Sequence, residues 1–450
     1  MTDALSNQKT DLGLLREALE SGTLRQVRRL VHALHPAEIA DLLESLPPSE
    51  RAIVWDLVND DDEGDVLLEL NDEVRSGIID EMNAADLVAA TDGMDLDDLA
   101  DFVADLPEAV TQQVIRSLSD RDKERLQDVL AYPEDSAGGL MNPNTISVRP
   151  DVNLEVVLRY LRILGDIPDK TEAVFVVDRH GRYLGALYMS RLVTRDPTDS
   201  VLSVMDASVY PIPCESPADE VAREFSNRDL VSAPVVNAQG TLIGQITIDD
   251  VVDVIEDQAE HAVLSMAGLD EEEDMFAPVV ASARRRAVWL GVNLATAFLA
   301  AAVVGQFEAT LEKVVILAVL MPVVASMGGI AGSQTLTLMI RGLALGRVEQ
   351  SNTRWLLAKE SAVGLLNGIA WAVVVGLVTV AFFSTWEVGL IIAAAITLNL
   401  VIAAVAGIMI PLVLRRLHID PALAGSVVLT TVTDVVGFVT FLGLGALFLT

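Results

Sequence analysis

Residues 421–450 read PALAGSVVLTTVTDVVGFVTFLGLGALFLT, and this last apolar stretch decides the class of fold. It is longer than the about 20 apolar residues that an α-helix needs to cross a bilayer. Asp434 is its only ionisable side chain. An ionised carboxylate at mid-membrane costs at least about 2.5 kcal/mol, so it normally faces a cavity, a partner or an ion path. We interpret Asp434 as lining a cation path. The alternative is a protonated, structural aspartate that is hydrogen-bonded to a neighbouring helix.

Four more apolar stretches precede this one, so hydropathy predicts five spans. The spans are expected near residues 286–306, 313–340, 358–383, 387–414 and 421–449. Basic residues flank them at alternate ends: Arg284, Arg285, Arg286, Arg341, Arg347, Arg354, Lys359, Arg415 and Arg416. Because basic loops stay in the cytoplasm, this pattern places the N-terminal part inside and the C-terminus outside. We therefore expect an integral protein of the cell (inner) membrane with a cytoplasmic N-terminal half.

The charge of the chain is divided very unevenly between its two parts. Residues 281–450 hold 10 Lys/Arg and 7 Asp/Glu, whereas residues 1–280 hold 21 and 58, so the formal net charge of −34 belongs to the N-terminal part. Such an acidic part argues against nucleic-acid partners, which need basic patches. It suits small cations, or it forms a solvated acidic surface. The single cysteine, Cys214, excludes a disulfide framework and a thiolate-rich metal site.

Residues 1–135 have the pattern of short amphipathic helices separated by polar or proline breaks. PAEIADLLESLP at 36–47 and DLDDLADFVADLP at 95–107 repeat leucine at helical spacing. Helix pairs of this kind stack into a superhelix in which each pair buries the apolar face of its neighbour. Aspartates in the first turn are favoured by the helix dipole, which explains most of them without a binding role. Asp97 and Asp101 differ, because their spacing of four residues lets them share an ion.

Residues 139–260 contain an internal duplication. VFVVDRHGRYLGAL at 174–187 is echoed by APVVNAQGTLIGQI at 233–246, with a period of 59 residues. Each copy predicts an apolar strand, a polar turn with glycine, a second strand and a helix. This unit resembles a tandem pair of cystathionine-β-synthase (CBS) domains, which often bind adenosine nucleotides. The resemblance marks Thr247 and Asp250 as a nucleotide cleft for ATP or another adenine nucleotide, although many such pairs are empty or bind metal instead.

The order of these parts resembles one family, the MgtE magnesium channels, over essentially the whole chain. The motifs that carry the resemblance are EDSAGGLM at 134–141, MPVVASMGGIAGSQTLTLMIRGLALG at 321–346, RRLHIDPAL at 415–423 and TTVTDVVG at 430–437. The resemblance implies a multidomain fold. It comprises an acidic α-helical superhelix (1–135), an α/β tandem CBS pair (136–250), an acidic connecting helix and linker (251–280) and an α-helical transmembrane pore domain of five spans (281–450).

The resemblance also implies a function. In that family a homodimer encloses a pore at the subunit interface, and Asp434 matches the pore carboxylate that holds a hydrated magnesium ion. Cytosolic Mg2+ clamps acidic elements together and closes the pore, which makes the protein a channel for passive Mg2+ uptake. The regulatory carboxylates that match are Asp65, Asp97, Asp101, Asp229, Asp250 and Asp253. Independently, magnesium prefers oxygen ligands, and the absence of His and Cys from the predicted spans disfavours zinc and copper.

The sequence departs from the family pattern at two places. Ile330 follows Gly328 and Gly329 where the family usually has asparagine, so an amide that could line the path is missing. The two glycines fit either close helix packing or a pore wall. His261 and Ala262 replace an acidic pair of the connecting helix, which predicts fewer bridging ions and weaker inhibition.

Two other classes of function remain as alternatives. One is a secondary transporter of divalent cations coupled to protons or sodium, although five spans cannot divide into two equal inverted repeats. The other is a nucleotide-sensing membrane regulator, for which the intramembrane Asp434 would serve no purpose. The sequence contains no nucleophile–base pair and no phosphate-cradling loop, so we do not expect an enzyme.

Overall fold

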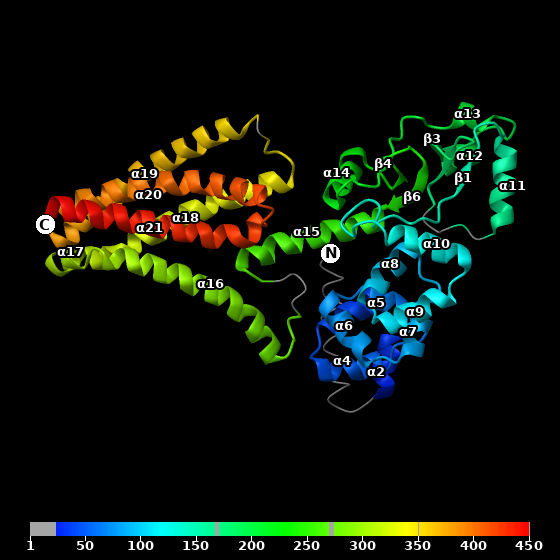
Figure 1. Cartoon of the computed structure of the whole chain (residues 1–450), viewed down its shortest axis with the longest axis horizontal. Helices are drawn as coiled ribbons and strands as arrows, with labels where there is room; N and C mark the ends of the chain where they lie inside the picture. The colour runs from blue at the N-terminus through cyan, green and yellow to red at the C-terminus, as the bar shows by residue number, and fades with distance from the viewer. Residues whose placement is uncertain (1–23, 166, 168–170, 270–273, 350, 450) are drawn as a thin grey trace. The chain divides into compact units, whose positions relative to one another are not determined.

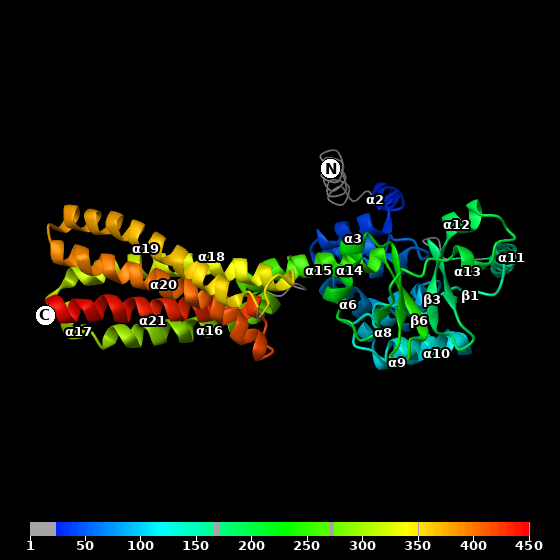
Figure 2. The ribbon, with the colours of Figure 1, turned by 90° about the horizontal axis from the view of Figure 1, so that it is seen from above.

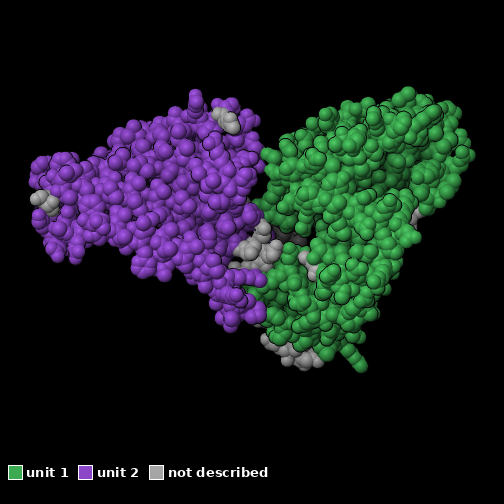
Figure 3. Space-filling view, viewed as in Figure 1, with its two compact units in different colours: residues 1–259, 272–277 green, residues 260–271, 278–450 purple. Residues whose placement is uncertain are grey.

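The computed structural model describes residues 24–165, 167, 171–269, 274–349 and 351–449, so the first residues of the predicted superhelix lie outside the described chain. The chain divides into two compact units (Figure 3). The N-terminal unit comprises the described residues up to 259 together with 274–277, and the C-terminal unit comprises 260–269 and the described residues from 278.

Short helices fill the first part of the N-terminal unit. They are α2 (Leu24–Val31), α3 (Pro36–Glu44), α4 (Pro48–Trp55), α5 (Glu63–Leu68), α6 (Asp72–Glu81), α7 (Ala84–Ala90), α8 (Leu96–Asp105), α9 (Glu108–Ser117) and α10 (Asp120–Val129). Asn71, Asn83 and Ser119 accept hydrogen bonds from first-turn amides and so satisfy donors that a helix start leaves open. Helices two places apart contact one another, as α3 with α5, α5 with α7 and α7 with α9. This stacking confirms the predicted superhelix.

A buried arginine attaches a distant segment to these helices. The Arg51 guanidinium on α4 donates to the carbonyl oxygens of Leu43 and Leu46 at 3.0 and 3.1 Å, and to Asp274 Oδ2 at 3.0 Å. The backbone N–H of Asp274 donates to a carboxylate oxygen of Glu73 on α6 at 2.6 Å. Arg51 and Asp274 are both buried. The segment that leads toward the first apolar helix is therefore part of the N-terminal unit.

Replacing Arg51 with methionine is expected to destabilise the N-terminal unit by about 3 kcal/mol, because it leaves a buried carboxylate without its cation. The full chain in detergent would be melted while its circular dichroism is followed. Arg28→Met on the exposed face of α2 is the matched control. Equal melting temperatures for the two variants would show that the buried ion pair contributes nothing.

The two halves of the duplication fold alike. β1 (Ser147–Val148), β2 (Ala173–Val177) and β3 (Tyr183–Tyr188) form one sheet, and β4 (Ile212–Pro213), β5 (Ser232–Val236) and β6 (Leu242–Thr247) form the other. In each sheet the first pair is parallel and the second antiparallel. Gly181 and Gly240 occupy equivalent turns with φ of +78° and +77°, a backbone region that favours glycine. The predicted duplication is confirmed.

Five helices complete the duplicated unit and leave it. They are α11 (Leu154–Leu164), α12 (Met189–Thr194), α13 (Val201–Val204), α14 (Ala218–Arg228) and the long α15 (Ile248–Ala267). The last of these follows β6 without a loop, because Asp250 Oδ2 accepts hydrogen bonds from both the N–H and the hydroxyl of Thr247 at 3.0 Å. The connecting helix therefore begins three residues before the predicted boundary at 251.

Five long apolar helices and one short helix form the C-terminal unit. They are α16 (Val279–Gly305), α17 (Glu308–Lys313), α18 (Val315–Ala344), α19 (Thr353–Phe383), α20 (Trp386–Arg416) and α21 (Pro421–Leu449). The five long ones lie side by side in Figures 1 and 2, and each is long and apolar enough to cross a membrane. The number of spans is confirmed. Two helices begin earlier than hydropathy predicts, at 279 and 353, because the helical backbone continues through the basic turns at their ends.

α20 is the central helix of this unit, in contact with α18, α19 and α21. On the face of α19 toward α20, small residues recur every fourth position: Gly364, Gly368, Ala372 and Gly376, all buried. A methyl group at Gly364 would stand 2.9 Å from the carbonyl oxygen of Leu400. Such small residues let helix backbones approach closely within a membrane.

Candidate functional site

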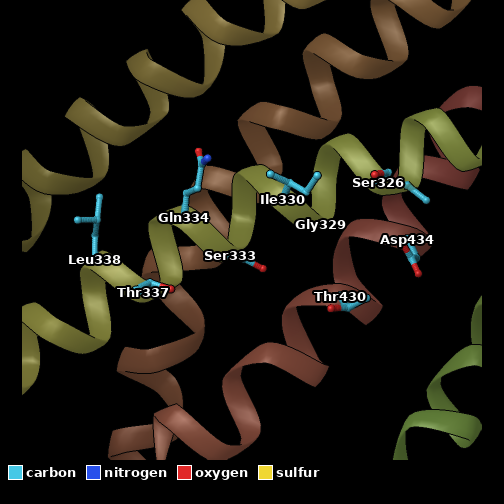
Figure 4. A pocket seen from close by; sticks show the side chains of 10 residues that line it. Ser326, Gly329, Ile330, Ser333, Gln334, Thr337, Leu338, Thr430 and Asp434 are labelled. Carbon is cyan, nitrogen blue, oxygen red and sulfur yellow. The ribbon is translucent and has the colours of Figure 1, made fainter. Parts of the chain in front are cut away.

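A pocket of about 950 Å³ lies between α18 and α21 and contains Asp434. Its lining consists of Ala325, Ser326, Gly329, Ile330, Ser333, Gln334, Thr337, Leu338, Thr430 and Asp434. Figure 4 shows Thr430 and Asp434 one helical turn apart on α21, with the α18 residues along the opposite wall. Asp434 therefore lines an open groove, and its place in a cation path stays a prediction.

Most of the surface of this pocket is apolar, and its few polar side chains carry mainly oxygen atoms. Asp434 is its only charged side chain, and hydroxyls of Ser326, Ser333, Thr337 and Thr430 with the amide of Gln334 supply neutral polar groups. Hard divalent cations prefer such ligands, and magnesium gives up its hydration water reluctantly. One carboxylate among hydroxyls can therefore hold a hydrated cation through its water.

Gly328 and Gly329, for which the sequence allowed either helix packing or a pore wall, have different surroundings in the structure. Gly329 lines the pocket, and a methyl group there would meet nothing within 4 Å. Gly328 is buried, and a methyl group there would stand 2.3 Å from Asn399 Nδ2. Gly328 thus serves helix packing, while Gly329 belongs to the pocket wall. Ile330 also lines the pocket, so an apolar side chain occupies the position where the resembling family has an amide.

A second, acidic pocket of about 440 Å³ lies in the N-terminal unit, where α8 and α15 meet. Its acidic lining consists of Asp97, Asp98, Asp101, Glu134, Asp135, Asp219, Asp250, Asp253 and Asp257. Four of the predicted regulatory carboxylates, Asp97, Asp101, Asp250 and Asp253, therefore meet in one place. Asp98 was missed, although it stands in the same Asp-rich turn and could form a three-carboxylate group with Asp95 and Asp97.

Burial strongly perturbs this pocket. Burial first, and the nearby Asp250 carboxylate second, raise the pKa of Asp97 to about 8 and that of Asp98 to about 7. Burial likewise raises the pKa of Asp250 and of Asp253 to about 6. Asn142 Nδ2 donates to Asp97 Oδ1 at 3.1 Å. Buried carboxylates with no basic residue in the pocket lining favour either protons or a metal cation.

Two predicted regulatory residues lie elsewhere. Asp65 is exposed on α5, and Asp229 is exposed at the end of α14, where it adopts a left-handed conformation with φ of +52°. Neither lines the acidic pocket.

The residues predicted to bind a nucleotide do not lie in the cleft that best suits one. The Thr247 hydroxyl donates a hydrogen bond to Asp250, but Asp250 lines the acidic pocket. The negative charge of this pocket would repel a phosphate group. A different cleft of about 380 Å³ contains Tyr188, Tyr210 and Arg228, with the Arg228 guanidinium 6.0 Å from the centre of the Tyr210 ring. An aromatic ring and a guanidinium suit a base and a phosphate. Sequence reasoning missed this cleft, because the two tyrosines and the arginine belong to no single motif.

The connecting helix ends in a contact within the C-terminal unit. His261 Nε2 lies 3.2 Å from Asp420 Oδ2, and the Asp420 carboxylate accepts from the N–H groups of Ala422 and Leu423 at the start of α21. His261, which stands where the resembling family has an acidic residue, therefore contacts the Asp420 carboxylate at the start of α21, the helix that carries Asp434. The side chain of Ala262 lies outside the described residues.

Comparisons with known proteins agree along the chain. A family model described as divalent cation transporter matches residues 321–444, the MgtE intracellular N domain matches 34–135, and CBS domains match 137–197 and 201–257. The chain is 31% identical to the magnesium transporter MgtE of Thermus thermophilus, over 97% of this chain and 98% of that protein. It is 26% identical to the magnesium transporter MgtE of Bacillus subtilis, over 96% of each.

Among solved structures, the cytosolic domain of the Mg2+ channel MgtE in complex with ATP is 31% identical. It covers 53% of this chain and 98% of its own, with a TM-score of 0.48. The 31% identity with the Thermus protein extends over nearly the full length of both chains and establishes the family. The family models locate the separate domains within the chain. The chain belongs to the MgtE family of divalent cation transporters.

Proposed function

We propose that this protein is a magnesium channel that mediates passive Mg2+ uptake. The observation that carries the proposal is the position of Asp434, the only charged side chain that lines the pocket between the apolar helices α18 and α21. The curated relatives are named magnesium transporters, which supports Mg2+ as the ion. A single carboxylate that acts through water would bind the ion loosely enough to release it, as conduction requires.

The pore would form between two copies of the chain. In one copy the Asp434 pocket is an open groove with walls from α18 and α21 alone. A second copy would close the groove and bring a second Asp434 to the same ion. The pattern of basic residues supports a topology with the N-terminal unit in the cytosol and the C-terminus outside the cell.

Uptake into liposomes tests this proposal against the two alternatives. Purified protein should admit Mg2+ down its gradient without a proton or sodium gradient. A requirement for either gradient would favour the ion-coupled transporter, and no flux under any gradient would favour the nucleotide-sensing regulator.

Cytosolic Mg2+ would close the channel by binding in the acidic pocket. Asp97 and Asp101 of α8 line the same pocket as Asp250 and Asp253 of α15, so an ion bound by both pairs would join the superhelix to the connecting helix. Without the ion, the like charges repel and the two elements separate. Asp65 and Asp229, which lie outside the pocket, would bind further ions. The His261 and Ala262 substitutions would remove acidic ligands from the end of α15, so closure would depend chiefly on the acidic pocket.

Changing Asp97 and Asp101 together to asparagine should leave transport intact and make it less sensitive to cytosolic Mg2+. A ligand shifts a conformational equilibrium only by its differential affinity for the two states, and this variant loses two charged ligands of the closed state. Patch recordings would measure inhibition against internal Mg2+. Asp120→Asn with Glu124→Gln, an exposed pair of the same spacing on α10, is the matched control. An inhibition curve that overlays that of the unmodified protein would show that Asp97 and Asp101 do not bind the inhibitory ion.

A nucleotide is a second ligand of the N-terminal unit. The cleft with Tyr188, Tyr210 and Arg228 would take an adenine nucleotide such as ATP, with Arg228 at the phosphates. The match to CBS domains supports this assignment.

A further inference from the structure

Asn399 is a polar residue that the described ion path does not use. It lies on α20 and is fully buried in the C-terminal unit. Its Nδ2 donates to the carbonyl oxygen of Val324 on α18 at 3.0 Å, whereas its Oδ1 has no hydrogen-bond partner among the described residues. Buried amides usually satisfy both ends, and a leucine would fill the same space without the penalty of desolvation. The amide therefore supplies a polar contact that apolar packing does not need.

Glycines of two other helices close on this amide. A methyl group at Gly328 of α18 would stand 2.3 Å from Asn399 Nδ2, and one at Gly437 of α21 would stand 2.8 Å from the same atom. A methyl group at either position would force the Asn399 side chain to shift, since real Cβ atoms do not approach so closely. Asn399 thus fills the junction of three helices and is held by α18 through a hydrogen bond.

This junction lies directly behind the pocket of Asp434. Gly328 precedes Gly329, which lines the pocket, and Gly437 follows Asp434 by three residues, about one helical turn. α20 itself contributes no residue to the lining. One side chain outside the path therefore contacts both helices that form its walls.

We propose that Asn399 is a positioning residue that sets the width of the ion path by fixing α18 and α21 relative to each other. This inference rests on the proposed function. Selection among hydrated divalent cations depends on the dimensions of the path, because the ion keeps its water and meets its ligands through it. A hydrogen bond has a defined length and direction, which apolar contacts lack. The donor of Asn399 therefore defines a spacing that a leucine of similar size would leave loose.

Asn399→Leu tests the proposal in the full-length protein in liposomes. We expect the preference for Mg2+ over Ca2+ to fall by about tenfold, the lower end of the effect of groups that position metal ligands. Leu398→Ala is the matched control, since Leu398 is the neighbouring residue on α20 and is 46% exposed. Flux is normalised to folded protein, so a loss of stability alone leaves the ion preference unchanged. An unchanged preference would overturn the proposal even if the melting temperature fell.

A double-mutant cycle tests the same contact without the bulk of leucine. Gly328→Ala should reduce the preference for Mg2+, because its methyl group displaces the amide, and Asn399→Ala should reduce it because the donor is lost. The two changes together should be markedly non-additive if the residues act as one spacer. Additive effects would show that Asn399 and Gly328 act separately. Asp434→Ala separates this inference from the proposed function. Full flux in that variant would overturn the proposed function itself, whereas lost flux in Asp434→Ala together with an unchanged ion preference in Asn399→Leu would overturn only this inference.

Discussion

Asp434→Ala is expected to abolish Mg2+ flux and to leave a folded, membrane-inserted protein. The variant removes the only charge from the pocket between α18 and α21, so a hydrated cation loses its electrostatic attraction to the path. Folding should not suffer, because a carboxylate inside a membrane costs at least about 2.5 kcal/mol and alanine costs nothing comparable. A Mg2+-sensitive dye enclosed in liposomes would record the flux. Asp434→Asn should retain some permeation but lose discrimination against monovalent ions, because it removes the charge and keeps the size.

The matched control for Asp434 is Glu387→Gln, which neutralises an exposed acid at the start of α20. It should transport like the unmodified protein. Flux from the alanine variant at the level of this control would remove Asp434 from the path. The protonated, structural reading of this residue would then be the correct one.

The response to cytosolic Mg2+ is expected to depend steeply on pH between about 6 and 8. Burial raises the pKa of Asp97 to about 8, of Asp98 to about 7 and of Asp250 to about 6, from an ordinary value of 3.8. A raised carboxyl pKa means that the assembled pocket binds protons more tightly than the separated elements do. The ion-free pocket is therefore most stable below about pH 4 and loses stability as pH rises through these values.

Magnesium binding follows the opposite trend, because the ion needs deprotonated carboxylates and displaces their protons. The inhibitory Mg2+ concentration should fall by up to about tenfold per pH unit for each proton displaced. At pH 6, removal of Mg2+ should open the channel less completely, since protonation relieves the repulsion that separates α8 from α15. Patch recordings at pH 6, 7 and 8 would measure both effects. Curves that coincide across this range, or a pH dependence between pH 7 and 8 that is undiminished in Asp97→Asn, would contradict the assignment.

Much of this architecture follows from the sequence because its patterns are local. The repeat of 59 residues predicts both sheets, because each antiparallel strand pair is joined by a glycine turn and so consists of segments adjacent in the sequence. Five apolar stretches predict five helices by length alone. The predicted starts at 286 and 358 were too late, since the helices begin at 279 and 353. Hydropathy marks where the apolar residues begin, whereas the helical backbone continues through the charged residues before them.

The site was only partly predictable, because it depends on which distant segments meet. Asp434 could be identified within one span, since a lone carboxylate there has few explanations. The acidic pocket required the contact of α8 with α15, so the sequence did not distinguish Asp98, which lines it, from Asp65, which does not. Asn399 gave no signal at all, because its role depends on two glycines in other helices.

The covalent path between the two units has a mechanical consequence. The chain passes into the C-terminal unit within α15, rejoins the N-terminal unit around Asp274, where Arg51 anchors it, and leaves again at Pro278. The chain therefore crosses between the two units three times rather than once. In the proposed closure, ion binding in the acidic pocket would act on the first apolar helix through the Asp274 segment as well as through the connecting helix. Flexible residues inserted after Ala277 would weaken the mechanical connection between the N-terminal unit and the first apolar helix.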